Sequence, residues 1–129
     1  MNTPLVPISW GELFDKVTIL EIKLDKITSQ KAKANVEREF EALNLIFIDG
    51  CNQNLKALDL VRDLRKVNLT LWDIEDCIRA KEKRNTFDSE FIQYARDVYI
   101  TNDKRSKIKK QINEIFGSEL TEEKSYSEY

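Results

Sequence analysis

The sequence predicts an all-α protein, a four-helix bundle dominated by a long antiparallel hairpin of two helices. Glycine and proline are scarce, with 3 Gly and 2 Pro among 129 residues, whereas a β-sandwich or barrel needs both at many corners. Charged residues make up 34% of the chain and hydrophobic residues 41%. Long amphipathic helices have this composition, because each combines an apolar stripe with a wide solvated face. We expect a single domain over residues 1–117.

The first helix is predicted to begin at Ser9 and to extend to about residue 27. Ser9 and Glu12 have the spacing of a capping box, and Ile8 and Leu13 have that of a hydrophobic staple. The apolar positions are Trp10, Leu13, Val17, Leu20, Leu24 and Ile27 on one side and Ile19 and Ile22 on the other. A helix that is apolar on two sides is expected to be central or to share its second face with a partner.

A second helix is predicted from about residue 31 to residue 48. Its stripe contains Val36, Phe40, Leu43 and Phe47. Asp49 and Gly50 follow directly, and we expect them to end the helix in a turn.

The third helix is predicted to begin near residue 52 and to continue unbroken to residue 84. Its stripe contains Leu55, Leu58, Val61, Leu64, Asn68, Leu71, Glu75 and Ile78. A break at residues 66–68 is the alternative, but the helical period passes through these residues without a jump in phase.

The fourth helix is predicted to follow a turn at Asn85 and Thr86, with Asp88 as its N-cap, and to end at Phe116 before Gly117. Its seam repeats in steps of three and four and contains Phe91, Tyr94, Val98, Thr101, Arg105, Ile108, Ile112 and Ile115. This repeat is typical of a helical hairpin or bundle seam. Residues 118–129 are expected to form an acidic tail, either disordered or docked through Leu120 and Tyr126.

Composition excludes several classes of function. The net charge of -2 gives no attraction to nucleic acid or to an anionic membrane, and no apolar run approaches the ~18 residues of a membrane span. The absence of histidine excludes Ser-His-Asp and Cys-His catalysis and histidine-based zinc sites. Residues 1–7 do not resemble a signal peptide. We therefore expect a cytoplasmic protein in which Cys51 and Cys77 are free thiols.

Two acidic pairs form one candidate site. Glu12 and Asp15 lie on the first helix and Asp73 and Asp76 on the third, each pair three residues apart and so on one helix face. If the two faces meet, their carboxylates are suited to Mg²⁺, an arrangement comparable to that of all-α nucleotide pyrophosphohydrolases. The alternative is that these side chains are solvated and that Glu12 serves Ser9 as a capping partner, in which case no cofactor is expected.

Polar side chains on the apolar seams form a second candidate site. They are Asn68, Glu75 and Arg79 on the third helix and Asn102 and Arg105 on the fourth. If the turn is centred near residue 86, the antiparallel register places Leu64 level with Ile108, Asn68 with Arg105, Leu71 with Thr101 and Ile78 with Tyr94.

Two interpretations of these polar side chains stay open. One is a satisfied polar layer that sets the register, in which Arg105 binds Asn68 and reaches toward Glu75. The other is a small-anion pocket in which Arg79 and Arg105 clamp the ligand, as in an anion-binding helical-bundle enzyme.

Four blocks carry a resemblance to a known family: ISWGELFDKVTILEIKLDKI (8–27), VNLTLWDIEDCIRAKE (67–82), FDSEFIQYARDVYITNDKRSKIKKQIN (87–113) and GSELTEEKSY (117–126). The chain resembles a bacterial and phage family that is catalogued only as a domain of unknown function. The resemblance implies no activity and no catalytic residues. It implies only an association with proteins of surface-polysaccharide synthesis.

These observations favour a non-enzymatic interaction or assembly module that forms a homo-oligomer and binds a protein partner, with a link to surface-polysaccharide synthesis suggested by the resemblance. The competing class is a small metal-dependent or anion-binding enzyme. Nucleic acid and membranes are not expected as partners.

Overall fold

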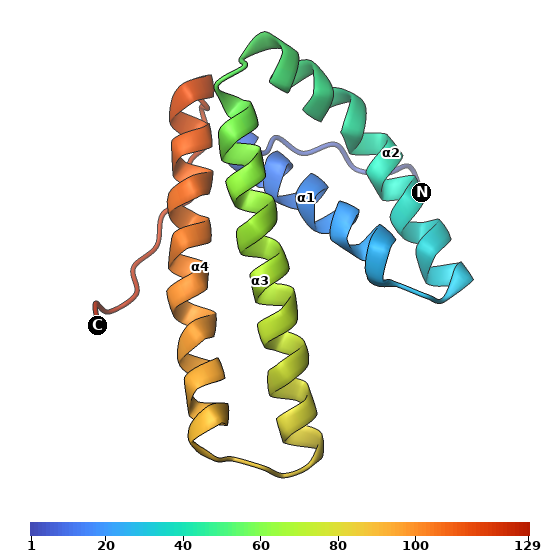
Figure 1. The fold of residues 1–129 in the computed structure, drawn as a ribbon. Coiled ribbons are helices and arrows are strands. Elements are labelled where there is room, and N and C mark those ends of the chain that lie inside the picture. The colour runs from blue at the N-terminus through green and yellow to red at the C-terminus, as the bar shows by residue number, and fades with distance from the viewer.

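The computed structural model describes all 129 residues and contains four helices and no strands. The helices are α1 (Trp10–Lys26), α2 (Gln30–Gln53), α3 (Ala57–Lys83) and α4 (Ser89–Phe116). The two longest, α3 and α4, run antiparallel side by side as a hairpin (Figure 1). The predicted all-α class and the dominant hairpin are confirmed.

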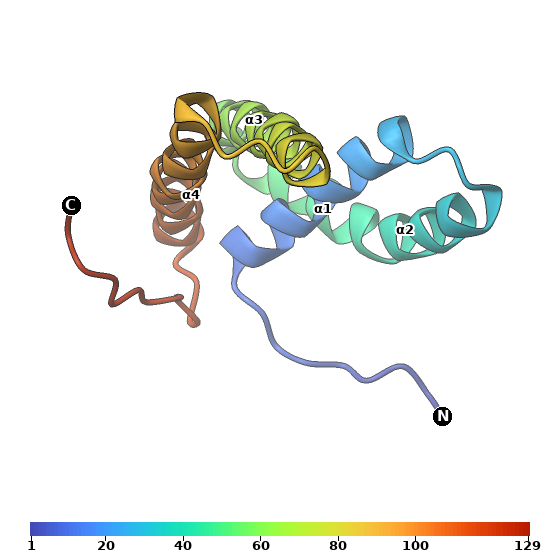
Figure 2. The same ribbon diagram turned by 90° about the horizontal axis from the view of Figure 1, so that it is seen from below.

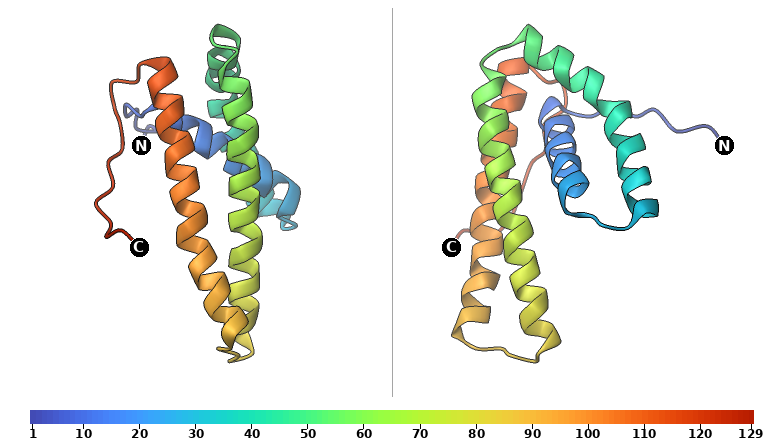
Figure 3. Two further views of the ribbon diagram at one scale, coloured as in Figure 1. Left: turned by 60° about the vertical axis from the view of Figure 1, so that its left-hand side comes forward. Right: turned by 45° about the vertical axis from the view of Figure 1, so that its right-hand side comes forward.

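Helix α1 is the central element of the fold. It contacts each of the other three helices, and Figures 2 and 3 show it between the hairpin and α2. Its fully buried Phe14 and Val17 belong to the same core cluster as Val61 and Leu64 of α3 and Ile112 of α4. This position explains why α1 is apolar on two sides: one side meets the hairpin and the other meets α2.

Helix α2 continues past the predicted end at Asp49 and Gly50 and ends at Gln53, so that prediction was wrong. Gly50 has a packing role instead of a turn role. A Cβ atom at this position would lie 2.7 Å from Cζ3 of Trp10, well inside contact distance. The glycine therefore lets the indole of α1 approach the backbone of α2.

Helix α3 begins at Ala57, five residues later than predicted, after a short turn at residues 54–56. The later start changes which side chains face inward. Ala57 is fully buried, whereas Leu55 and Leu58, predicted for the buried stripe, are 69% and 52% exposed. From Ala57 onward the helix is continuous, so the predicted absence of a break at residues 66–68 is confirmed.

The hairpin turn is stabilised by ion pairs and by an N-cap on α4. Asn85 adopts a left-handed conformation with φ 52°, and Asp88 caps α4 by accepting from the Phe91 amide at 3.0 Å. The buried Lys81 ammonium lies 2.9 Å from a carboxylate oxygen of Asp88 and 3.1 Å from one of Glu90.

The C-terminal segment folds back along α4 after the cap at Gly117 (Figure 3). The Tyr129 hydroxyl donates to Asp103 at 2.5 Å, and its ring packs edge-to-face on Tyr99 with 4.9 Å between centroids. Leu120 and Tyr126, the side chains named for the docked alternative, are 44% and 72% exposed. The segment contacts α4 through Tyr129 and through the Glu122 carboxylate, which pairs with Lys109. None of the four helices is both long and apolar enough to cross a membrane.

Candidate functional site

The first turn of α1 is held against the end of α4. The Ser9 hydroxyl accepts from the Glu12 amide at 3.1 Å, which confirms the predicted N-cap. The Gly11 amide donates to the side-chain oxygen of Asn113 at 2.7 Å. The Trp10 amide donates to the hydroxyl of Ser118, just after the end of α4, at 3.3 Å. The free amides at this helix end thus have partners within the chain.

Replacing Ser9 with alanine is expected to lower the free energy of unfolding by about 1 kcal/mol, the usual effect of losing an N-cap. Denaturant melts measure this change. The matched control is Ser29→Ala, which removes the cap of α2 at a site where the hydroxyl is exposed and its bond to the Ala32 amide is longer, at 3.3 Å. We expect the smaller loss at Ser29. Equal unfolding midpoints for wild type and Ser9→Ala would show that the Ser9 cap does not stabilise the protein.

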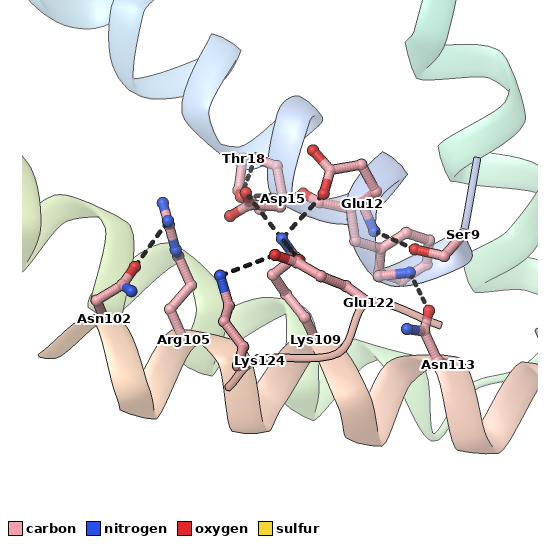
Figure 4. Close-up of polar contacts among 12 residues, drawn as sticks. Ser9, Glu12, Asp15, Thr18, Asn102, Arg105, Lys109, Asn113, Glu122 and Lys124 are labelled. Carbon is pink, nitrogen blue, oxygen red and sulfur yellow. Dashed lines mark hydrogen bonds and ion pairs between the residues drawn. The ribbon is translucent and has the colours of Figure 1, made fainter. Parts of the chain in front are cut away.

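Lys109 of α4 is the centre of the most buried polar cluster. Its ammonium lies 2.9 Å from Glu12, 3.1 Å from Glu122 and 3.7 Å from Asp15, and Figure 4 shows it reaching from α4 toward α1. Burial lowers the pKa of Lys109, but the hydrogen bond to Glu12 and the charges around it raise the pKa above its ordinary value overall. The amine is therefore protonated and acts as a structural cation rather than as a nucleophile.

Asn68 of α3 extends this cluster to a third helix. Its amide nitrogen donates to the Asp15 carboxylate and to the Thr18 hydroxyl, both at 3.0 Å. All three side chains are buried. A polar layer thus exists, but the predicted bond between Asn68 and Arg105 is not formed. The reason is that α1 packs across the hairpin and supplies closer partners than the opposite helix does.

The five predicted seam residues surround one open cavity of about 470 Å³ among α1, α3 and α4. They are Asn68, Glu75, Arg79, Asn102 and Arg105. Arg105 donates to the Asn102 side-chain oxygen at 2.8 Å, as Figure 4 shows, whereas Glu75 pairs with Arg79 at 3.3 Å on its own helix. The prediction that Arg105 reaches toward Glu75 was wrong. The structure therefore brings the five side chains around one space, and only Asn68 belongs to the buried layer.

The two acidic pairs do not come together. Glu12 and Asp15 face Lys109, while Asp73 and Asp76 of α3 are exposed. No group of three or more cysteine or acidic side chains is placed to hold a metal ion. The carboxylates on α1 are instead engaged by Lys109 of α4 and, at Asp15, by Asn68 of α3.

Sequence reasoning missed Lys109 and Thr18 as buried members of this cluster and Glu122 as an exposed partner of Lys109. Lys109 follows Ile108 directly and precedes Ile112 by three, so it lies beside the seam of α4. A two-helix hairpin would leave that position in solvent. Only the crossing of α1 buries it, and no local pattern signals that crossing.

Glu122 ties the C-terminal segment to the cluster. Hydrogen bonds from Lys124 and Lys109 lower the pKa of its carboxyl from 4.5 to about 2. Because the folded-state pKa is depressed, the contribution of this group is complete above pH 4.5 and is lost as the pH falls toward about 2. We expect the segment to leave α4 over this interval.

The release is measured by backbone NMR relaxation of residues 118–129 as a function of pH. Glu122→Gln is expected to mobilise the segment already at neutral pH. The control Glu123→Gln changes the neighbouring exposed carboxylate, which forms no ion pair, and should leave the segment in place. An immobile segment in Glu122→Gln would contradict the role of this carboxylate.

Comparison with known proteins identifies one family. Residues 5–129 match the model of a family of unknown function, DUF6165. The match includes the C-terminal segment that docks on Lys109. No curated protein and no solved structure matches the chain. The family description gives no activity, so the association with surface-polysaccharide synthesis stays a prediction.

Proposed function

The chain belongs to this family of unknown function, and we propose that it serves as a non-enzymatic interaction module that self-associates. The observation that carries the proposal lies at the corner where α2 leads into α3. Leu45 and Ile48 of α2 are 76% and 44% exposed. Leu55 and Leu58 are 69% and 52% exposed. These four side chains are called the corner surface below.

Single exposed leucines are ordinary on protein surfaces, but a concentration of large apolar side chains marks an interaction site. Residues 45–58 expose five such side chains, which are the four of the corner surface and Ile46. Helix α2 packs on α1 and lies at the edge of the molecule, so its outer side faces away from the other helices (Figures 1 and 2). Burying these side chains against a partner removes apolar area from water, which favours association.

A second copy of the chain is the partner that this surface fits. The same stretch carries charges of both signs, with Asp49 and Asp59 alternating with Lys56 and Arg62. A two-fold dimer places the corner surface against itself, so leucines meet leucines while flanking acids of one copy can face bases of the other. The net charge of -2 adds little repulsion between copies.

Sedimentation velocity at micromolar concentration tests the proposal, with the wild-type chain expected as a dimer. The double variant Leu45→Glu/Leu55→Glu is expected as a folded monomer, because it places charges at the centre of the interface. Ile92→Glu is the control, since Ile92 is also exposed, at 58%, but lies on the hairpin. That variant should stay dimeric.

A monomeric wild type would overturn self-association. If Ile92→Glu is monomeric while the double variant stays dimeric, the interface lies on the hairpin and the proposed role of the corner surface is wrong. Circular dichroism of each variant confirms that the helices are retained.

A further inference from the structure

We propose that the cavity among α1, α3 and α4 binds a small carboxylate with an apolar body, held by Arg105. The inference is independent of self-association, because the cavity lies within one chain. Its volume of about 470 Å³ falls in the range of small-molecule sites, which is about 300–1,000 Å³.

Arg105 is the anchor of the site because its charge is not neutralised by the protein. It is the only one of the arginines that is half-buried, since the others are exposed. The buried lysines Lys81 and Lys109 have two and three carboxylates within 4.0 Å, whereas Arg105 has none. Its one side-chain partner is the neutral Asn102, at 2.8 Å. Most of the five guanidinium donors therefore remain free, and their planar fork matches a carboxylate.

The other polar groups of the cavity add acceptors and a second cation. Asn68 uses its amide nitrogen on Asp15 and Thr18, which leaves its carbonyl oxygen without a partner in the chain. Arg79 pairs only with Glu75, and its side chain is 79% exposed. Such an exposed pair contributes little to stability, so Arg79 can move to a ligand at small cost.

The charged groups and the apolar side chains that line the cavity together indicate which class of ligand fits. Glu75 and Asp76 also line the cavity, and their negative charges oppose a dianion such as a phosphate monoester more than a monoanion. Trp72, Leu71 and Ile19 supply an apolar wall beside the arginines. A ligand that combines one carboxylate with an apolar ring or chain satisfies both parts of the lining.

Benzoate is a suitable probe, titrated into the millimolar range on the ¹⁵N-labelled full chain. We expect shifts of the Arg105 side-chain N–H and of the Trp72 indole N–H signals, with Trp10 unaffected. Arg105→Gln is expected to weaken binding by at least about tenfold, the effect of losing charge-assisted hydrogen bonds. Arg105→Lys should also bind more weakly than wild type, because an ammonium group lacks the planar fork.

The control variant is Arg96→Gln, which removes an exposed arginine elsewhere on α4 and should leave the affinity unchanged. Inorganic phosphate is the comparison ligand and is expected to bind more weakly than benzoate. Three results would overturn the proposal: no shift with benzoate, equal affinity in Arg105→Gln and wild type at matched Tm, or phosphate binding as tightly as benzoate.

Discussion

Replacing Lys109 with methionine is expected to lower the free energy of unfolding by about 3–5 kcal/mol, the loss typical of removing one partner of a buried ion pair. Methionine keeps most of the aliphatic stem, so the change isolates the charge. The side chain of Lys109 is 11% exposed and that of Asp15 only 7%. Without the ammonium, Asp15 keeps its bond from Asn68 but loses its nearby counter-charge, and Glu12 loses its cation as well. Chemical denaturation at neutral pH measures the loss.

Two further variants separate the buried charge from general effects of substitution. Lys110→Met changes the next residue, which is exposed and forms no ion pair, and is expected to alter stability by less than about 0.5 kcal/mol. Adding Asp15→Asn to Lys109→Met should recover part of the loss, because it removes the unpaired carboxylate. If the double variant is less stable than Lys109→Met alone, Asp15 and Lys109 are not coupled as described.

Replacing Gly11 with alanine is expected to lower the free energy of unfolding by about 2–3 kcal/mol. The added Cβ would lie 2.5 Å from the carbonyl oxygen of Lys109 and 2.9 Å from the side-chain oxygen of Asn113. The first of these atoms is helix backbone and cannot rotate away, so α1 must move off α4. That movement also breaks the hydrogen bond from the Gly11 amide to Asn113, which measures 2.7 Å.

Gly50→Ala is the informative comparison for this prediction. Its Cβ would also lie too close to a neighbour, but that neighbour is the ring of Trp10, a half-buried side chain that can shift. Alanine is in addition the better helix former inside α2, by about 1 kcal/mol. We therefore expect a clearly smaller loss than at Gly11. Thermal melts that rank the two variants in the opposite order would contradict the tight contact between α1 and α4.

Local signals in the sequence were sufficient for most helix ends. The Ser9 and Asp88 caps and the Gly117 stop lie where predicted, because capping depends on side-chain and backbone groups within three or four residues. The predicted end of α2 was wrong because it relied on local signals alone. Gly50 resembles a turn residue locally, and only its contact with Trp10, forty residues away in the chain, explains why it lies inside a helix.

For the candidate site, too, the sequence identified residues but not their partners. The seam residues Asn68 and Arg105 were recognised because polar side chains interrupt an apolar repeat, and both line the cavity among α1, α3 and α4. Their partners were wrong: Asn68 binds Asp15 and Thr18, and Arg105 binds Asn102. The predicted register considered α3 and α4 alone, whereas α1 supplies the partners of Asn68.

The sequence by itself thus determined the helical class, the two-helix hairpin and the helix caps, since each depends on periodicity or on neighbours along the chain. Tertiary structure decided which charged groups are buried and what they bind. Lys109 resembles any solvated lysine beside a seam until α1 crosses α4 and encloses it with Glu12 and Asp15. Burial of a charge is a property of the packed helices, because it depends on which surfaces exclude water, and those surfaces come from segments almost a hundred residues apart.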